Sequence, residues 1–244
     1  MPVTMREEID TSFDFRRDTP AKRDPDSRSA MLRRYHQLLW SKSLPSGEHL
    51  DLAATTPRVY LHHKSEQLGE FWFASDSAIP TFTREGKIRH VTEQIPSEVR
   101  DRFNSLAYTI GGMMLWPGQR VGRKATINGA RGLHPRIKDR FDLTVECVSR
   151  HYAGTQSPLT ATLGRYAAFF SLFGSFQGFV EFFLLQDLVD TERGTVNLFT
   201  PFRGFDSSPL PQSESEYRSY MADATQFIGA RNDRIQRYWE GLGA

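Results

Sequence analysis

The stretch from Thr109 to Tyr152 constrains the fold of this chain most, because its character changes twice. Residues 108–116 are mostly apolar, which predicts a buried strand. A loop rich in glycine and arginine follows, and a second short strand is expected at 125–128. After Pro135 the apolar residues recur at helical spacing. A chain with this order of segments must combine a sheet with helices.

The two halves of the chain differ in pattern. The first half mixes helical and strand periodicity, whereas the second half is helical and contains seven phenylalanines within fifteen residues. Gly174 and Gly178 interrupt this run, which predicts a Phe-rich helical hairpin. Because strands do not alternate regularly with helices, we predict an α+β fold with a small antiparallel or mixed sheet in the first half. The expected elements are helices at 29–42, at 95–107 and from 213 onward, and strands at 58–63 and 70–75.

Length and composition bear on the domain organisation and the setting. The chain has 244 residues, 39% of them hydrophobic, and a formal net charge of +2. We expect an extended N-terminal arm over residues 1–27 and a single α+β domain over 28–244. The single cysteine, Cys147, cannot form an intramolecular disulfide, which favours a reducing, cytoplasmic setting. No segment is long and apolar enough to predict a membrane span or a signal peptide.

Positive charge is concentrated in the middle of the chain. Between Gly118 and Arg140 there are seven Lys or Arg residues and one acid, Asp139, although the chain as a whole is nearly neutral. Such an excess is costly to gather without a negatively charged partner, so this segment is the best candidate for an anion-binding site. Its glycines allow backbone N–H groups to face an anion. The string GQRVGRK nevertheless lacks the spacing of a phosphate-binding P-loop.

A phosphate-bearing ligand, either a nucleotide or a nucleic acid, is therefore the first functional hypothesis. In this hypothesis the cations of the loop steer the ligand, and Asn128 and Arg131 orient it. Asp139 or Asp142 supplies a carboxylate if the protein is an enzyme, a question that the sequence leaves open. The predicted ligand-binding residues are Arg120, Arg123, Lys124, Asn128, Arg131 and Arg140.

The same residues allow two other interpretations. In the first, the acids Asp139 and Asp142 neutralise the arginines, and no ligand site remains. In the second, the protein is a non-enzymatic interaction module of a phage-defence or toxin-like system. Its basic loop and last helix then bind an acidic protein, and the positive surface is extended by Arg231, Arg234 and Arg237.

The sequence predicts no metal site. The adjacent histidines His62 and His63 fall in a predicted strand, where neighbouring side chains point to opposite faces and cannot easily bind one ion. The remaining histidines lack the spacing of metal ligands. The sequence does not indicate a cofactor either.

Several strings of the chain resemble a family of uncharacterised bacterial proteins, a domain of unknown function. The resemblance rests on TINGARG at 126–132, DRFDLTVECVSRHY at 139–152 and LFGSFQGFVEFFLLQDLV at 172–189. It extends to DFRRDTP and RRYHQLLWSKSLPSG in the first fifty residues, and so covers most of the chain. It implies a single domain and a bacterial or prophage source. It brings no known activity, cofactor or catalytic residue.

Overall fold

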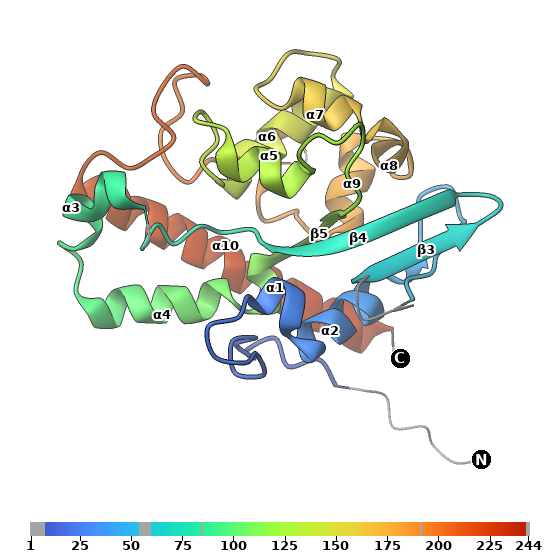
Figure 1. Ribbon diagram of the computed structural model, residues 1–244, viewed down its shortest axis with the longest axis horizontal. Helices are drawn as coiled ribbons and strands as arrows, with labels where there is room; N and C mark the ends of the chain where they lie inside the picture. Colours follow the sequence, from blue (N-terminus) through green and yellow to red (C-terminus); the bar gives the residue numbers. More distant parts are fainter. Residues whose placement is uncertain (1–7, 54–59, 84, 191, 243–244) are drawn as a thin grey trace.

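Figure 1 shows the computed structural model, which describes residues 8–53, 60–83, 85–190 and 192–242. The fold is α+β, and its main sheet has three antiparallel strands in the order β3-β4-β5. Two shorter antiparallel pairs, β1-β2 and β6-β7, lie outside this sheet. The strands are β1 (Lys42–Ser43), β2 (His49–Leu50), β3 (Leu61–Ser65), β4 (Gly69–Ser77), β5 (Met113–Pro117), β6 (Val189–Asp190) and β7 (Thr195–Val196).

Helices cover the sheet from both sides. In the view of Figure 1, α5 to α9 lie above the sheet, α1, α2 and α4 lie below it, and the long α10 runs across the molecule. No described helix combines the length and apolar character needed to cross a lipid bilayer. The helices are α1 (Pro25–Arg28), α2 (Ala30–Trp40), α3 (Arg89–Thr92), α4 (Ser97–Ala107), α5 (Ile127–Leu133), α6 (Phe141–Tyr152), α7 (Thr160–Gly164), α8 (Ala167–Ser171), α9 (Phe176–Phe182) and α10 (Glu214–Gly241), with 3₁₀ turns η1 (Gly86–Ile88) and η2 (Ile110–Gly112).

The predicted Phe-rich hairpin is confirmed as part of the core. It forms α8 and α9, and Gly174 reverses the chain between them with a left-handed φ of 69°. Gly178, which was also expected to interrupt the run, lies inside α9 instead. Phe173 packs on Phe182 with ring centroids 5.0 Å apart, and Phe182 packs on Phe183 at 4.9 Å. These tilted and edge-on contacts are the arrangements that aromatic rings prefer. The hairpin belongs to a hydrophobic core that reaches from Ile9 to Trp239.

Most predicted elements are confirmed, with one clear correction. The helix expected at 29–42 is α2, and the Ser29 hydroxyl accepts a hydrogen bond from the Leu32 N–H at 2.9 Å. The strand expected at 58–63 is β3, although residues 58 and 59 lie outside the described residues. The strand expected at 125–128 is wrong. Thr126 instead caps α5, because its hydroxyl accepts from the Gly129 N–H at 3.3 Å.

The described part of the N-terminal segment, residues 8–27, packs against the rest of the chain. Ile9 and Phe15 are buried. The Phe15 N–H donates to the Tyr108 carbonyl at 3.1 Å, and the Asp10 N–H donates to the Tyr35 hydroxyl at 2.8 Å. This packing places Arg16 beside the end of α4, where it lines a cavity described below.

Candidate functional site

Arg131, the centre of the predicted anion site, is completely buried and fully engaged by the protein. Five protein oxygens surround its guanidinium: Asp76 Oδ2, Asp139 Oδ1, Thr144 Oγ1 and the carbonyls of Ala78 and Asp139. A guanidinium has five N–H donors, so this arrangement leaves none for a ligand. The predicted ligand-binding role of Arg131 is therefore corrected to a structural one, since this arginine joins α5, β4 and the start of α6.

The two acids beside Arg131 differ in exposure. The Asp76 side chain is 13% exposed, whereas that of Asp139 is 40% exposed. Burial raises the pKa of Asp76 to about 7, although Arg131 beside it acts in the opposite direction. Burial would by itself lower the pKa of Arg131, but Asp139 and Asp76 raise it. Asp139 is thus the member of the cluster that can reach a molecule from solution.

Arg140 and Asp142 form a second buried ion pair. The Arg140 Nε donates to Asp142 Oδ1 at 3.0 Å, and the side chains are only 3% and 0% exposed. Asp142 also accepts from the Phe199 N–H at 2.9 Å, while Arg140 donates to the Pro209 carbonyl at 3.2 Å. The pair therefore fastens the loop after β7 to the start of α6. This corrects both predictions: Arg140 is not available to a ligand, and Asp142 is not placed to act as a catalytic carboxylate.

The remaining predicted ligand residues lie apart from this cluster. Arg120, Arg123 and Lys124 are exposed on the loop between β5 and α5 and do not line the cavity that holds Asp139. Asn128 is half-buried against the sheet, and its Nδ2 donates to the Ser75 carbonyl at 3.1 Å. The structure therefore does not bring the predicted set together in one pocket.

The basic surface expected on the last helix is smaller than predicted. Arg231 is completely buried and donates to the carbonyls of Met113 and Phe183 at 2.7 and 3.0 Å. Arg234 forms an ion pair with Asp187 at 2.8 Å. Arg231 is therefore inaccessible and Arg234 is neutralised by Asp187, so neither is available to an acidic protein partner.

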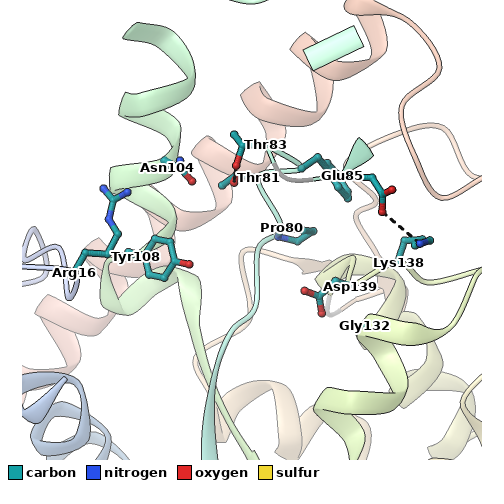
Figure 2. A pocket seen from close by; sticks show the side chains of 11 residues that line it. Arg16, Pro80, Thr81, Thr83, Glu85, Asn104, Tyr108, Gly132, Lys138 and Asp139 are labelled. Carbon is teal, nitrogen blue, oxygen red and sulfur yellow. Dashed lines mark hydrogen bonds and ion pairs between the residues drawn. The ribbon is translucent and has the colours of Figure 1, made fainter. Parts of the chain in front are cut away.

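A cavity of about 400 Å³ opens beside Asp139. Figure 2 shows Arg16, Asn104 and Tyr108 on one side of it and Lys138 and Glu85 on the other, with the segment around Pro80 between them. Its volume is in the range of small-molecule sites. The lining residues are Arg16, Pro80, Thr81, Phe82, Thr83, Glu85, Asn104, Tyr108, Gly132, Lys138 and Asp139.

Side chains of the core hold the floor of this cavity in place. The Tyr220 hydroxyl donates to the Pro80 carbonyl at 2.7 Å, and the Tyr217 hydroxyl donates to the Thr81 carbonyl at 2.6 Å. Both tyrosines are on α10 and are buried. The floor segment therefore has a fixed backbone and presents the hydroxyls of Thr81 and Thr83, which lie 3.3 Å apart.

The charged groups of the cavity are balanced. Lys138 contacts Glu85 at 3.3 Å, and Arg16 forms a two-pronged contact with Asp14 while stacking over the Tyr108 ring at 5.1 Å. The Lys138 side chain is 25% exposed, so its single contact is accessible to an exchanging anion. The Asn104 side chain, in contrast, has no hydrogen-bond partner in the part of the chain that the structure describes.

The backbone is strained at three positions that line the cavity. Phe82, Lys138 and Asp139 have φ values of 57°, 48° and 67°, in the left-handed region that non-glycine residues rarely adopt. Such conformations cost roughly 1–3 kcal/mol each and concentrate at binding and active sites. The two consecutive cases turn the chain sharply between α5 and α6 and aim the Asp139 carboxylate at the cavity.

Two other polar groupings do not form reactive sites. His36 Nε2 lies 2.9 Å from Ser75 Oγ, as in a Ser–His pair, but both residues are buried. The Trp40 N–H donates to His36 Nδ1, so the proton of the neutral imidazole is on Nε2, and His36 cannot accept the serine proton there. Among the described residues no group of three His, Cys, Asp or Glu side chains is placed to hold a metal ion.

The comparison with protein families identifies the chain as a member of a family of unknown function. The model "Family of unknown function (DUF6994)" matches residues 9–235. The match spans every residue that lines the cavity. No curated protein and no solved structure matched the chain. The resemblance to a family of unknown function seen in the sequence is confirmed, whereas the bacterial source that it implied stays a prediction.

Proposed function

We propose that this protein binds a small phosphate-bearing metabolite, of the mononucleotide or sugar phosphate class, in the cavity beside Asp139. The observation that carries the proposal is the convergence of Lys138, Asp139, Asn104 and Thr81 from three separate segments of the chain. Together they offer one cation, one accessible carboxylate, one unpartnered amide and a hydroxyl pair with Thr83. This combination matches a ligand that carries an anionic group together with several hydroxyl or amino groups.

Lys138 is the residue proposed to meet the phosphate. Its ammonium contacts only Glu85 among the described residues, at 3.3 Å and partly exposed. A phosphate offers more charge and more acceptor oxygens than one carboxylate oxygen, so it can compete with Glu85 for the Lys138 ammonium. Arg16 is less free to exchange, because Asp14 already binds it through two nitrogens. Burial by itself would raise the pKa of Asp14, but Arg16 lowers it.

Asp139 and Asn104 are proposed to bind the uncharged part of the ligand. A carboxylate accepts hydrogen bonds from hydroxyl and amino groups, and an amide both donates and accepts. A single-stranded nucleic acid fits this site less well, since proteins of that class offer a continuous basic groove. The exposed cations Arg120, Arg123 and Lys124 are on a different loop, away from the cavity lining.

A thermal-shift series tests the proposal. Mononucleotides and sugar phosphates should raise the unfolding temperature, because a ligand bound only to the native state stabilises it by about 2.7 kcal/mol at a hundredfold excess over Kd. The panel is completed by inorganic phosphate, the unphosphorylated nucleosides and sugars, and an oligonucleotide of about ten nucleotides. The oligonucleotide should give no larger shift than the mononucleotides.

Two variants assign the effect to the cavity. Asn104→Ala should weaken binding of all active ligands about tenfold without loss of stability, because this side chain has no hydrogen-bond partner among the described residues. Lys138→Met should weaken the binding of the phosphorylated ligands only. Asn197→Ala, at an exposed asparagine outside the cavity lining, is the matched control. Unchanged shifts in both cavity variants, or no shift with any ligand, would exclude this site.

A further inference from the structure

Lys42 has surroundings unlike those of an ordinary surface lysine. It follows α2 directly, in β1, and its ammonium is enclosed by the aromatic rings of Trp40, Phe182 and Tyr238. The Nζ atom lies 5.0, 4.7 and 4.5 Å from the three ring centroids. Within the described residues no carboxylate forms an ion pair with Nζ. In the described structure, aromatic rings rather than an ion pair thus surround the amine.

The same lysine lines a cavity of about 600 Å³ between the β1-β2 pair and the ends of α9 and α10. The walls near Lys42 are largely apolar and include Leu38, Leu44 and Pro45. This cavity shares no lining residue with the one beside Asp139. Whatever it binds is thus independent of the proposed phosphate site.

The surroundings favour the uncharged amine. Burial lowers the pKa of Lys42 to about 7, and the nearby Arg231 acts in the same direction. The rings attract an ammonium, which limits this effect. The other titratable groups that line the cavity are His49, Glu181 and Tyr238. A lysine with an ordinary pKa has only about one unprotonated amine in 2,500 at pH 7, so even a partial shift greatly increases the nucleophilic fraction.

We propose that Lys42 is a nucleophilic amine that captures the carbonyl group of an apolar aldehyde or ketone in this cavity as an imine. The Nζ lone pair attacks the carbonyl carbon, and the carbonyl oxygen takes a proton, giving a carbinolamine. The nitrogen then forms the C=N double bond as the oxygen leaves as water, carrying both protons of the original amine. Glu181 and His49 line the cavity and are the groups available to move these protons.

Imine trapping tests this inference on the intact protein. The protein is incubated with hexanal and cyanoborohydride at pH 7, and peptide mass spectrometry measures alkylation of each lysine. Lys42 should be labelled at least tenfold faster than Lys64, whose side chain is 69% exposed, or the exposed Lys124. At pH 10 the difference should shrink, because a lysine amine of ordinary pKa is about 30% unprotonated at that pH. Equal or slower labelling of Lys42 at pH 7 overturns the proposal.

A concentration series separates capture in a cavity from reactivity alone. The labelling rate of Lys42 should saturate as hexanal is increased, since the aldehyde binds before it reacts. The rate at Lys64 should stay proportional to concentration. A strictly proportional rate at Lys42 would show that no binding step precedes the reaction, and the proposed carbonyl site would be rejected. The Lys42→Arg variant should lose the saturable component of the labelling rate. Circular dichroism checks that this variant keeps the fold of the wild type.

Discussion

At the scale of single residues, Arg131 shows why the predicted site and the observed one differ. The sequence shows how many charges a segment has but not which of them are paired. The decisive partner of Arg131 is Asp76, which lies 55 positions earlier in the chain, on β4. Asp139, a predicted site residue, lines the cavity, but its neighbours Arg16 and Asn104 gave no local signal. They reach the cavity only through the packing of the N-terminal segment and α4.

Replacing Arg131 with methionine should destabilise the protein strongly. The change leaves Asp76 without a cation in a buried position, and breaking a buried pair in this way costs about 3–5 kcal/mol. Urea denaturation at pH 8 measures the difference from wild type. Arg136→Met is the matched control, because Arg136 pairs with Asp206 at the surface and should change the stability by less than about 0.5 kcal/mol. Similar values for the two variants would contradict the structural role of Arg131.

At the scale of elements, local sequence signals such as helix caps were the more reliable guide. The boundaries of half-buried segments were harder to predict. Ser29 and Ser213 mark helix starts because their hydroxyls satisfy the first free N–H groups, and both caps are present. The segment around Thr126 was misjudged, because a threonine before isoleucine suits either a strand or a helix cap. The strand predicted at 108–116 begins only at Met113, because η2 precedes it. A contact between η2 and α10 fixes this turn. Because the two elements are far apart in the sequence, local patterns could not predict the turn.

Gly111 provides a test of that contact. A Cβ atom added there would lie 2.5 Å from the Ile228 carbonyl oxygen and 2.6 Å from Asn232 Oδ1. Gly111→Ala should therefore force α10 away from η2 and cost about 1–3 kcal/mol in the free energy of unfolding. Gly229→Ala is the control, since its Cβ would meet nothing within 4 Å and helical alanine gains about 0.5–1 kcal/mol over glycine. Equal stability of the two variants would argue against this close packing.

At the scale of the whole molecule, buried carboxyls on the α1 side of the sheet couple folding to pH. Asp26 accepts from the Ser77 N–H at 3.0 Å through one oxygen, while its other oxygen is buried with no hydrogen-bond partner in the described part of the chain. Burial raises the pKa of Asp26 to about 8, and the nearby Asp76 adds to the effect. The folded state thus binds a proton more tightly than the unfolded state. The resulting stability is complete below about pH 4 and is lost as the pH rises through about 8.

An Asp26→Asn variant isolates this contribution. The asparagine oxygen still accepts from Ser77, but it does not ionise. Between pH 6 and 9 the wild type should lose about 1–3 kcal/mol relative to the variant, measured by urea denaturation at each pH. Lys42 and Arg231 titrate in both proteins, so their effects cancel in the comparison. Asp76, whose pKa is about 7, interacts with Asp26, and this interaction is part of the measured difference. Asp206→Asn changes a side chain that is 90% exposed. The free energy of unfolding of this control should vary with pH in the same way as that of wild type. A constant difference between wild type and Asp26→Asn would contradict the shifted pKa.

The position of α10 in the chain has a consequence for how the molecule matures. This 28-residue helix supplies the tyrosines that hold the carbonyls of Pro80 and Thr81, and the arginine that holds those of Gly111 and Met113. A ribosome releases these anchors after all the segments that they bind. Until then the nascent polypeptide has a cavity floor without its supports, so the cavity is complete only once α10 has been synthesised.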